Sequence, residues 1–344
     1  MARRPTPSQI AAFEALLEKA DAEVRDAFLA AVYSARSKVD LGALVAMIEA
    51  GDIEGVIALL RMDQGVLWPL EEALRRSYLA GGVAVDAFAP TGIEGRFGFN
   101  GRHLRAEADI ARIGGDLVRT LEREQNEAIR AVLLDAIERN RSSSQTALEI
   151  VGRKSLASGL REGGIVGLSG PQTDRYLKVQ RLMQTAEGVQ ELVVKKNGLL
   201  TVRYKVNAAT SNRIIAAYRK GGAVAAPDQT ISERQYKNQL LRQRGQLIAQ
   251  NEAHTAQSAG RHEAYRQMLD RPDIEAVTCK WIHGFSRDAR PDHKRMDGEV
   301  RNFGEGFVMD DGTVMQYPHD PAGGVRHSAS CRCTAFYRAI PRRS

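Results

Sequence analysis

The sequence predicts an α+β protein, with mainly α-helical N-terminal and central regions, a β-hairpin insertion and a small β-rich C-terminal module. Long stretches between prolines, such as residues 91–170 and 228–271, place apolar residues three or four positions apart, which is typical of helices. An Asn-Gly pair divides a run of β-prone residues at 192–206. Five of the 11 prolines and many of the aromatic residues fall in residues 272–344, where short strands and turns are therefore expected.

The N-terminal region, residues 1–90, is expected to be helical. Helices are predicted within residues 8–60, where apolar residues recur four positions apart at Val24, Phe28 and Val32. Ser8, Asp40 and Asp52 precede helical segments and are predicted N-caps, because a short polar side chain can accept a hydrogen bond from the first helical turn.

The central region, residues 91–270, is expected to hold two long helices, at 105–139 and 230–268, and a further helix that begins near Ser142. Asn197-Gly198 predicts a hairpin turn near 192–206. Ser232 and Gln235 have capping-box spacing, so they are placed at the start of the second long helix. The glycine-rich residues 158–171 fit neither a P-loop nor a dinucleotide-binding loop and are interpreted as a connector.

The C-terminal module, residues 271–344, combines aromatic side chains with glycine and proline turns. Asp311-Gly312 lies between two β-prone segments and predicts a second hairpin. One short helix is expected near residues 292–296.

Composition excludes several classes of protein. The 344 residues are 43% hydrophobic, which is too apolar for a disordered chain. There is no apolar run of 18 residues, so no membrane-spanning helix is expected. Three cysteines are too few for a disulfide framework in a chain of this length. Polar residues follow Arg3 and Arg4, so we expect no secretory signal and a soluble, intracellular protein.

The net charge of +7 is concentrated in the middle of the chain. Residues 151–270 contain 19 Lys and Arg against 9 Asp and Glu, an excess of 10 positive charges. Such an excess favours binding to phosphate backbones or to an acidic protein surface. The alternative is that these side chains only solvate the outer faces of long helices, because they do not form one cluster.

Cysteine and histidine residues gather in the C-terminal module and raise the possibility of a zinc site. The candidate ligands are His293, His327, Cys331 and Cys333. Cys331 and Cys333 form a Cys-x-Cys pair, whose side chains would point to opposite faces of a strand. Only a turn at this position would bring both sulfur atoms to one metal ion, and buried cysteines without a metal are the alternative.

Acidic residues near histidines raise an enzymatic alternative, a nuclease-like or hydrolase-like metal site. The residues concerned are Asp288, Asp292 and Asp297 beside His293, and Glu252 with His254 on the long helix. The aspartates are more simply explained as loop and capping residues around a short helix. The chain contains no GxSxG or HExxH motif, and we expect no enzyme.

The order of motifs in the C-terminal module resembles the Mu F-like phage head morphogenesis family. A Trp is followed by an Arg-x-x-His turn, an Asp-Gly, a Pro-x-Asp-Pro loop and a terminal Cys-Arg-Cys. The positions that fill this pattern are Trp281, Arg290, His293, Asp297, Gly298, Pro318, Asp320, Pro321, Cys331 and Cys333. The resemblance covers roughly residues 91–344 and is strongest at 240–335.

The resemblance implies a minor head protein of a tailed bacteriophage or prophage. Such a protein would be a low-copy structural component at the portal vertex or capsid interior, present in the virion and, during assembly, in the host cytoplasm. The implied partners are the phage portal protein and other head proteins, with packaged double-stranded DNA as a further hypothesis and no membrane. The alternatives are a nuclease- or toxin-like enzyme that binds a metal through the C-terminal module, and a transient assembly factor absent from the virion.

Overall fold

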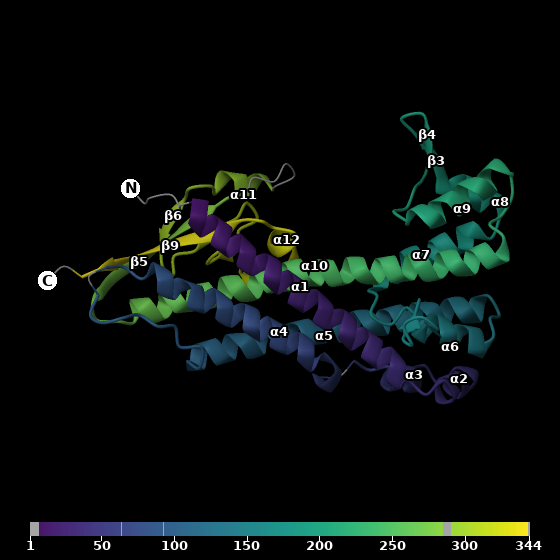
Figure 1. Ribbon diagram of the computed structural model, residues 1–344, viewed down its shortest axis with the longest axis horizontal. Coiled ribbons are helices and arrows are strands. Elements are labelled where there is room, and N and C mark those ends of the chain that lie inside the picture. The colour runs from purple at the N-terminus through teal and green to yellow at the C-terminus, as the bar shows by residue number, and fades with distance from the viewer. Residues whose placement is uncertain (1–6, 63, 92, 285–289, 343–344) are drawn as a thin grey trace. The chain divides into compact units, whose positions relative to one another are not determined.

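The computed structural model describes residues 7–62, 64–91, 93–284 and 290–342, with side chains left out at 7–14 and 64 (Figure 1). It is 62% helical, with small antiparallel sheets mostly in the C-terminal region, which confirms the α+β prediction. In the part of the chain described, no helix is long and apolar enough to cross a membrane. Arg3, Arg4, Asp288 and the side chain of Ser8 lie outside the described residues.

The chain forms two compact units, each built from segments that are far apart in the sequence. Unit 1 comprises residues 1–27, 69–116 and 246–344, and unit 2 comprises residues 28–68 and 117–245. Among the described residues, four helices contribute to both units: α1 (Pro7–Lys38), α4 (Gln64–Val83), α5 (Leu104–Glu138) and α10 (Ala226–Leu269). The domain boundaries expected at residues 90 and 270 stay a prediction.

Unit 2 is largely helical. Besides parts of the long helices it contains α2 (Leu41–Glu49), α3 (Ile53–Leu59), α6 (Ser143–Val151), α7 (Gly170–Met183), α8 (Ala186–Leu192) and α9 (Ala208–Arg219). The predicted caps of two of these helices are confirmed, and Ser142 caps the helix that was predicted to begin near it. Asp40 accepts a hydrogen bond from the Ala43 N–H, Asp52 from Gly55 and Ser142 from Gln145.

The buried part of the glycine-rich connector is residues 163–168, in unit 2. It follows a minimal antiparallel pair, β1 (Arg153–Lys154) and β2 (Arg161–Glu162). The Arg36 Nη2 donates to the carbonyls of Gly164 at 2.8 Å and Val166 at 2.6 Å. Arg244 donates to the Gly167 carbonyl at 2.8 Å. Two buried guanidinium groups therefore satisfy backbone acceptors that the connector does not pair within a sheet.

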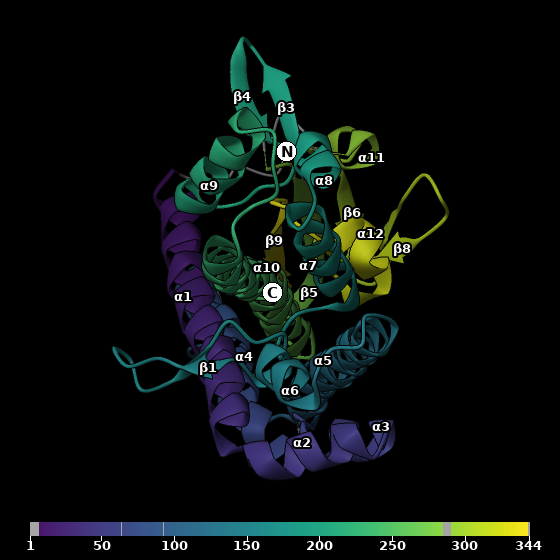
Figure 2. The same cartoon turned by 90° about the vertical axis from the view of Figure 1, so that its right-hand side faces the viewer.

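The predicted hairpin in residues 192–206 is confirmed. Strands β3 (Val193–Lys196) and β4 (Leu199–Val202) pair antiparallel, and Figure 2 shows them extending beyond α8 and α9. Asn197 and Gly198 have φ angles of 50° and 79°, as the two central residues of a type I′ turn require.

The second long helix begins earlier than its predicted capping box. α10 starts at Ala226, and Pro227 lies in its first turn, where the missing N–H of proline costs no helical hydrogen bond. Ser232 is consequently a buried residue inside the helix, so its prediction as the N-cap is wrong.

In unit 1, α4 (Gln64–Val83) packs closely against α10, and the 3-10 helix η1 (Ala84–Phe88) follows α4. A Cβ at Gly260 would lie 2.0 Å from the Tyr78 carbonyl oxygen, and one at Gly81 would lie 2.2 Å from the Gln257 oxygen. The Ser77 hydroxyl donates to the Ala253 carbonyl at 3.0 Å. Glycines on both helices thus allow the two backbones to approach each other.

The C-terminal module of unit 1 is built on a three-stranded antiparallel sheet, in the order β6–β5–β9. Its elements are β5 (Ile274–Ile282), α11 (Pro291–Arg295), β6 (Val300–Asn302), β7 (Phe307–Val308), β8 (Val314–Met315), the 3-10 helix η2 (Pro321–Gly323), α12 (Gly324–Ser328) and β9 (Thr334–Pro341). β7 pairs with β8 around Asp311-Gly312, so the second predicted hairpin is confirmed, and α11 confirms the predicted short helix.

The C-terminal half of α10 covers this sheet. His262 Nδ1 lies 3.0 Å from the Tyr337 hydroxyl of β9, and the rings of Tyr265 and Tyr337 stack with centroids 4.6 Å apart. Arg261 donates to the Thr334 hydroxyl at 2.9 Å. These contacts fix the first residues of β9, next to the Cys-x-Cys pair.

Candidate functional site

The Cys and His candidates of the C-terminal module lie around Trp281, near the end of β5. Trp281 is fully buried, as the alternating burial along this strand requires. Its ring meets the His293 ring edge-on, with centroids 5.3 Å apart, and the Phe307 ring at 5.2 Å. The indole thus forms one wall of the His293 environment.

His293 is presented by α11, one turn of helix that begins with Pro291. The residue before it, Arg290, donates from Nη2 to the Ala329 carbonyl at 2.7 Å, which ties the start of α11 to the end of α12. The Asp292 carboxylate accepts the His293 backbone N–H at 2.9 Å. Both contacts fix the N-terminal end of the short helix that carries His293.

The Cys-x-Cys pair is a turn, not part of a strand. Ser330 has a φ of 54°, and its N–H donates to the Asn251 side chain of α10 at 2.8 Å. The Cys333 N–H donates to the Cys331 sulfur at 3.4 Å, and β9 begins only at Thr334. The strand geometry that would separate the two sulfur atoms does not apply, so both thiols face the same side.

Both thiols face one nitrogen of His293. The Nδ1 atom lies 3.4 Å from Cys331 Sγ and 3.6 Å from Cys333 Sγ, and the three ligand atoms are all within 4.8 Å of one another. All three side chains are buried. A hydrogen bond from the Cys331 thiol holds the pKa of Cys333 below its usual range, and His293 and the Gly284 N–H lower it further. The same hydrogen bond raises the pKa of Cys331.

His327 belongs to a neighbouring group. Its Nε2 lies 3.1 Å from an Asp311 carboxylate oxygen, and its Nδ1 lies 3.6 Å from Asp292. The hydrogen bond from His327 lowers the pKa of Asp311. The His327 ring stacks on His293, with centroids 5.7 Å apart. Three of the four predicted zinc ligands therefore converge on one point, while the fourth pairs with carboxylates beside them.

The remaining motif residues shape the loops around this cluster. Asp297 accepts the His283 N–H at 2.9 Å, and Gly298 has a φ of 85° that favours glycine. Asp320 accepts the N–H groups of Gln316 at 2.7 Å and Ala322 at 3.0 Å, and it caps η2. Pro318 and Pro321 flank Asp320, with Pro321 at the first position of η2.

A second histidine contact in unit 1 joins residues whose spacing in the sequence does not predict it. His319 has a φ of 68°, is buried, and meets the His254 ring edge-on at 5.1 Å. Burial lowers the pKa of His319 to about 3 and that of His254 to about 4. Burial also raises the pKa of Glu252 to about 7, with a smaller contribution from Asp116. These shifts come mainly from desolvation.

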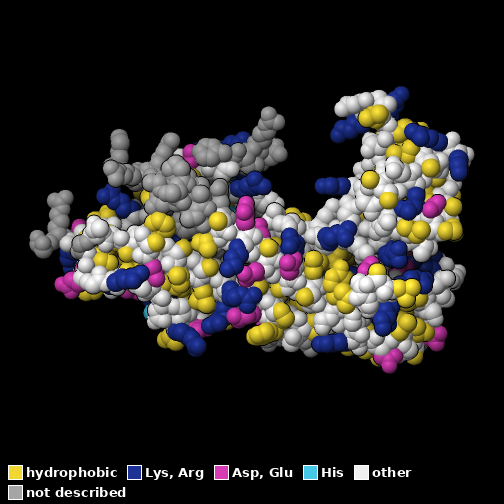
Figure 3. Space-filling model, viewed as in Figure 1, with side chains coloured by type: hydrophobic (Ala, Val, Ile, Leu, Met, Phe, Trp, Pro, Cys, Tyr) yellow, Lys and Arg dark blue, Asp and Glu magenta, His cyan; other side chains and the backbone are white. Residues whose placement is uncertain are grey.

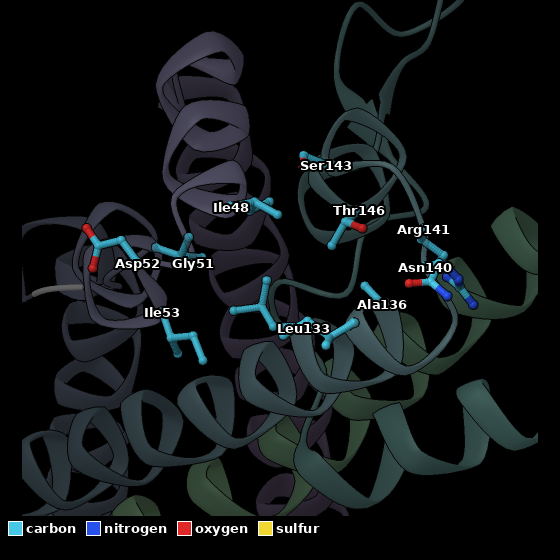
Figure 4. Close-up of a pocket in the computed structure, with 12 residues that line it drawn as sticks. Ile48, Gly51, Asp52, Ile53, Leu133, Ala136, Asn140, Arg141, Ser143 and Thr146 are labelled. Atoms are coloured by element: carbon cyan, nitrogen blue, oxygen red, sulfur yellow. The ribbon is translucent and has the colours of Figure 1, made fainter.

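A pocket in unit 2 lacks comparable chemistry (Figure 4). Its volume is about 230 Å³, and its apolar wall includes Ile48, Ile53 and Leu133. The polar residues at its edge are already engaged, because Asp52 caps α3 and Arg141 pairs with Asp135 at 3.0 Å. Among its described lining residues, this pocket therefore holds no cluster comparable to the one around His293.

Comparison with known families identifies the region that contains this cluster. Residues 208–336 match the family model described as phage Mu protein F like protein. This region of the chain is similar to the Mu F-like phage head morphogenesis family. The match confirms the predicted resemblance over this Mu F-like region, whereas the similarity seen at residues 91–207 stays a prediction. No curated protein and no solved structure matches the chain.

The Mu F-like region runs from the start of α9 into β9 and contains the whole Cys and His cluster. The family indicates a phage head morphogenesis protein that is associated with the virion. The family motif lies in this region, where its polar side chains mainly form hydrogen bonds to backbone groups of the loops.

Proposed function

We propose that this Mu F-like chain is a minor head protein of a tailed bacteriophage or prophage, in low copy at the portal vertex or capsid interior. The family match at residues 208–336 carries the proposal. The portal protein and other head proteins are its proposed partners. The helical composition supports a role in protein contacts, because long helices offer extended faces for docking.

Cross-linking mass spectrometry of purified particles tests this placement. We expect the chain in finished virions, with cross-links to the portal protein. Recovery only from assembly intermediates would instead establish a transient assembly factor. Cross-links to the major capsid protein alone, far from the vertex, would contradict the portal placement.

We further propose that the β3–β4 hairpin contributes to contact with packaged DNA. The basic hairpin, defined here as the exposed residues Lys195, Lys196, Arg203 and Lys205, lies in the segment with the large positive excess. Figure 3 shows Lys and Arg side chains on and around this hairpin. Exposed ammonium and guanidinium groups on a projecting turn can reach phosphates without a loss of packing.

The salt dependence of DNA binding tests the hairpin. For Lys195→Gln with Lys196→Gln we expect weaker binding to double-stranded DNA and a log K against log salt slope reduced by about 2, roughly one for each phosphate contact. The control is Lys19→Gln with Lys38→Gln, which removes the same charge from two exposed positions outside the basic segment. Equal loss in both double variants, or binding that does not respond to salt, would refute a hairpin contact.

We also propose that the chain has no catalytic turnover. The support is that Arg290, Asp297 and Asp320, three polar residues of the family motif, bind backbone groups. A nuclease assay with divalent metals tests this. Cleavage by the purified protein that is lost in His293→Ala would overturn the proposal and favour the metal-dependent enzyme.

A further inference from the structure

We propose that Cys331, Cys333 and His293 bind one Zn²⁺ ion through the two sulfur atoms and the Nδ1 nitrogen. The three atoms come from two segments that are far apart in the sequence, α11 and the turn before β9. Thiolate and imidazole are the ligands that zinc prefers. The inference is independent of the role in head assembly, because the site would stabilise the module in any setting.

The spacing of the three atoms fits tetrahedral zinc. Zinc–sulfur bonds of about 2.3 Å and zinc–nitrogen bonds of about 2.0–2.1 Å at a tetrahedral angle place sulfur and nitrogen roughly 3.6 Å apart. The distances from Nδ1 are 3.4 Å to Cys331 Sγ and 3.6 Å to Cys333 Sγ. Both distances lie close to the value that a shared zinc ion requires.

A zinc ion would replace the hydrogen bonds among these three groups. A neutral imidazole nitrogen that accepts has one lone pair, so only one of the two thiols can donate to His293 Nδ1. The other thiol is then left to hydrogen-bond to the neighbouring sulfur. A cation at the point where the three atoms converge satisfies all of them at once.

Backbone donors support the charged form of the two sulfur atoms. The Cys333 N–H donates to Cys331 Sγ, and the Gly284 N–H lies within hydrogen-bonding reach of the Cys333 sulfur. A Cβ at Gly284 would be 2.2 Å from the Arg332 carbonyl oxygen, so a side chain there would push this backbone away from the turn. Such outer hydrogen bonds orient thiolate ligands and tune their affinity for metal.

The fourth tetrahedral position is left to solvent or to an added donor. Among the residues that the structure describes, the group that shares the two sulfur atoms contains no fourth Cys, His, Asp or Glu. His327 is held by Asp311 at 3.1 Å and lies beside the site instead of in it. We therefore assign three protein ligands to the zinc ion and leave His327 out of the four residues predicted from the sequence.

Elemental analysis of the full chain, purified under reducing conditions, tests the proposal. We expect about one zinc per chain, lost in Cys331→Ser, Cys333→Ser and His293→Gln. Cys279→Ser is the matched control, because Cys279 is an equally buried cysteine of β5 that is hydrogen-bonded to Tyr337, away from the cluster. His327→Gln should keep its zinc. Zinc loss in His327→Gln as complete as in the cysteine variants would refute the three-residue site.

A measurement on the unmodified chain decides the matter if these variants fail to fold. Titration with a mercurial thiol reagent should release zinc in step with modification of two thiols, and replacement with Co²⁺ should give a thiolate charge-transfer band. No zinc after incubation with excess Zn²⁺ and removal of the unbound ion would overturn the proposal. A Cys331–Cys333 disulfide in the freshly purified, metal-free chain would overturn it as well.

Discussion

The buried Arg36 should be a major determinant of the stability of unit 2. Its side chain is fully buried and donates three hydrogen bonds, at 2.6, 2.8 and 3.1 Å, to the carbonyls of Gly164 and Val166. Burial lowers its pKa to about 10. The guanidinium is therefore a charged group that is retained in the interior by the backbone acceptors it serves.

Arg36→Met keeps much of the side-chain volume and removes the donors. Each buried carbonyl left without a partner costs about 1–3 kcal/mol, and two acceptors are affected. The gain from no longer burying a charge offsets part of this cost. We therefore expect a loss of about 2–4 kcal/mol in the free energy of unfolding. Arg36→Lys should recover only part, because an ammonium does not reproduce the planar fork.

Urea unfolding monitored by circular dichroism, together with hydrogen exchange, measures this effect. Exchange of the amides at 163–168 should accelerate in Arg36→Met, because the connector loses its attachment to α1. Arg242→Met is the control, since Arg242 is an exposed arginine of the same unit and its replacement should change stability by less than about 0.5 kcal/mol. A similarly small change in Arg36→Met, with unaltered exchange at 163–168, would show that the connector does not depend on the guanidinium.

Two further predictions concern unit 1. Burial lowers the pKa of His262 to about 3, so the unfolded state binds a proton that the folded state does not, and stability falls as the pH drops below about 6.5. Measurements of the free energy of unfolding at pH 8 and pH 5 should show that His262→Phe removes about 2 kcal/mol of this pH dependence. Tyr337→Phe, which deletes the hydrogen-bond partner of His262, should keep it. An equal dependence of stability on pH in the wild type and in His262→Phe would contradict the assignment. Gly260→Ala should lower stability by about 1–3 kcal/mol in thermal melts, because its Cβ would meet the Tyr78 oxygen. Gly222→Ala is the control, because a Cβ at Gly222 would lie in open space and should not lower stability. Equal melting temperatures for the two variants would refute the close helix contact.

Local signals in the sequence were sufficient for most helices and for both hairpins. Periodic apolar residues located α5 and α10, and Asn197-Gly198 and Asp311-Gly312 located the two turns. These features depend on residues close together in the chain, so a single sequence contains them. The helix α4 was harder to predict because Pro69 lies inside it and normally ends a helical pattern.

The residue types of the candidate metal site could be predicted from the sequence, but their geometry could not. The expectation that the two sulfur atoms cannot reach one metal ion assumed that Cys331 and Cys333 belong to a strand. The structure has a turn instead, made by the positive φ of Ser330, and serine carries no signal for that conformation. Asn251, from a helix 79 residues earlier in the sequence, holds the turn through the Ser330 N–H. Contacts over such separations leave no local pattern to read.

The distribution of hydrogen bonds in the Mu F-like region supports a structural role over a catalytic one. A catalytic acid or base needs a side-chain atom directed at a substrate, whereas Asp297, Asp320 and Arg290 direct theirs at backbone N–H and carbonyl groups of neighbouring loops. The groups that converge on one point are the two thiols and His293 Nδ1, and metal binding would use them to join α11 to the turn before β9. These contacts indicate that the motif residues hold the shape of a small module.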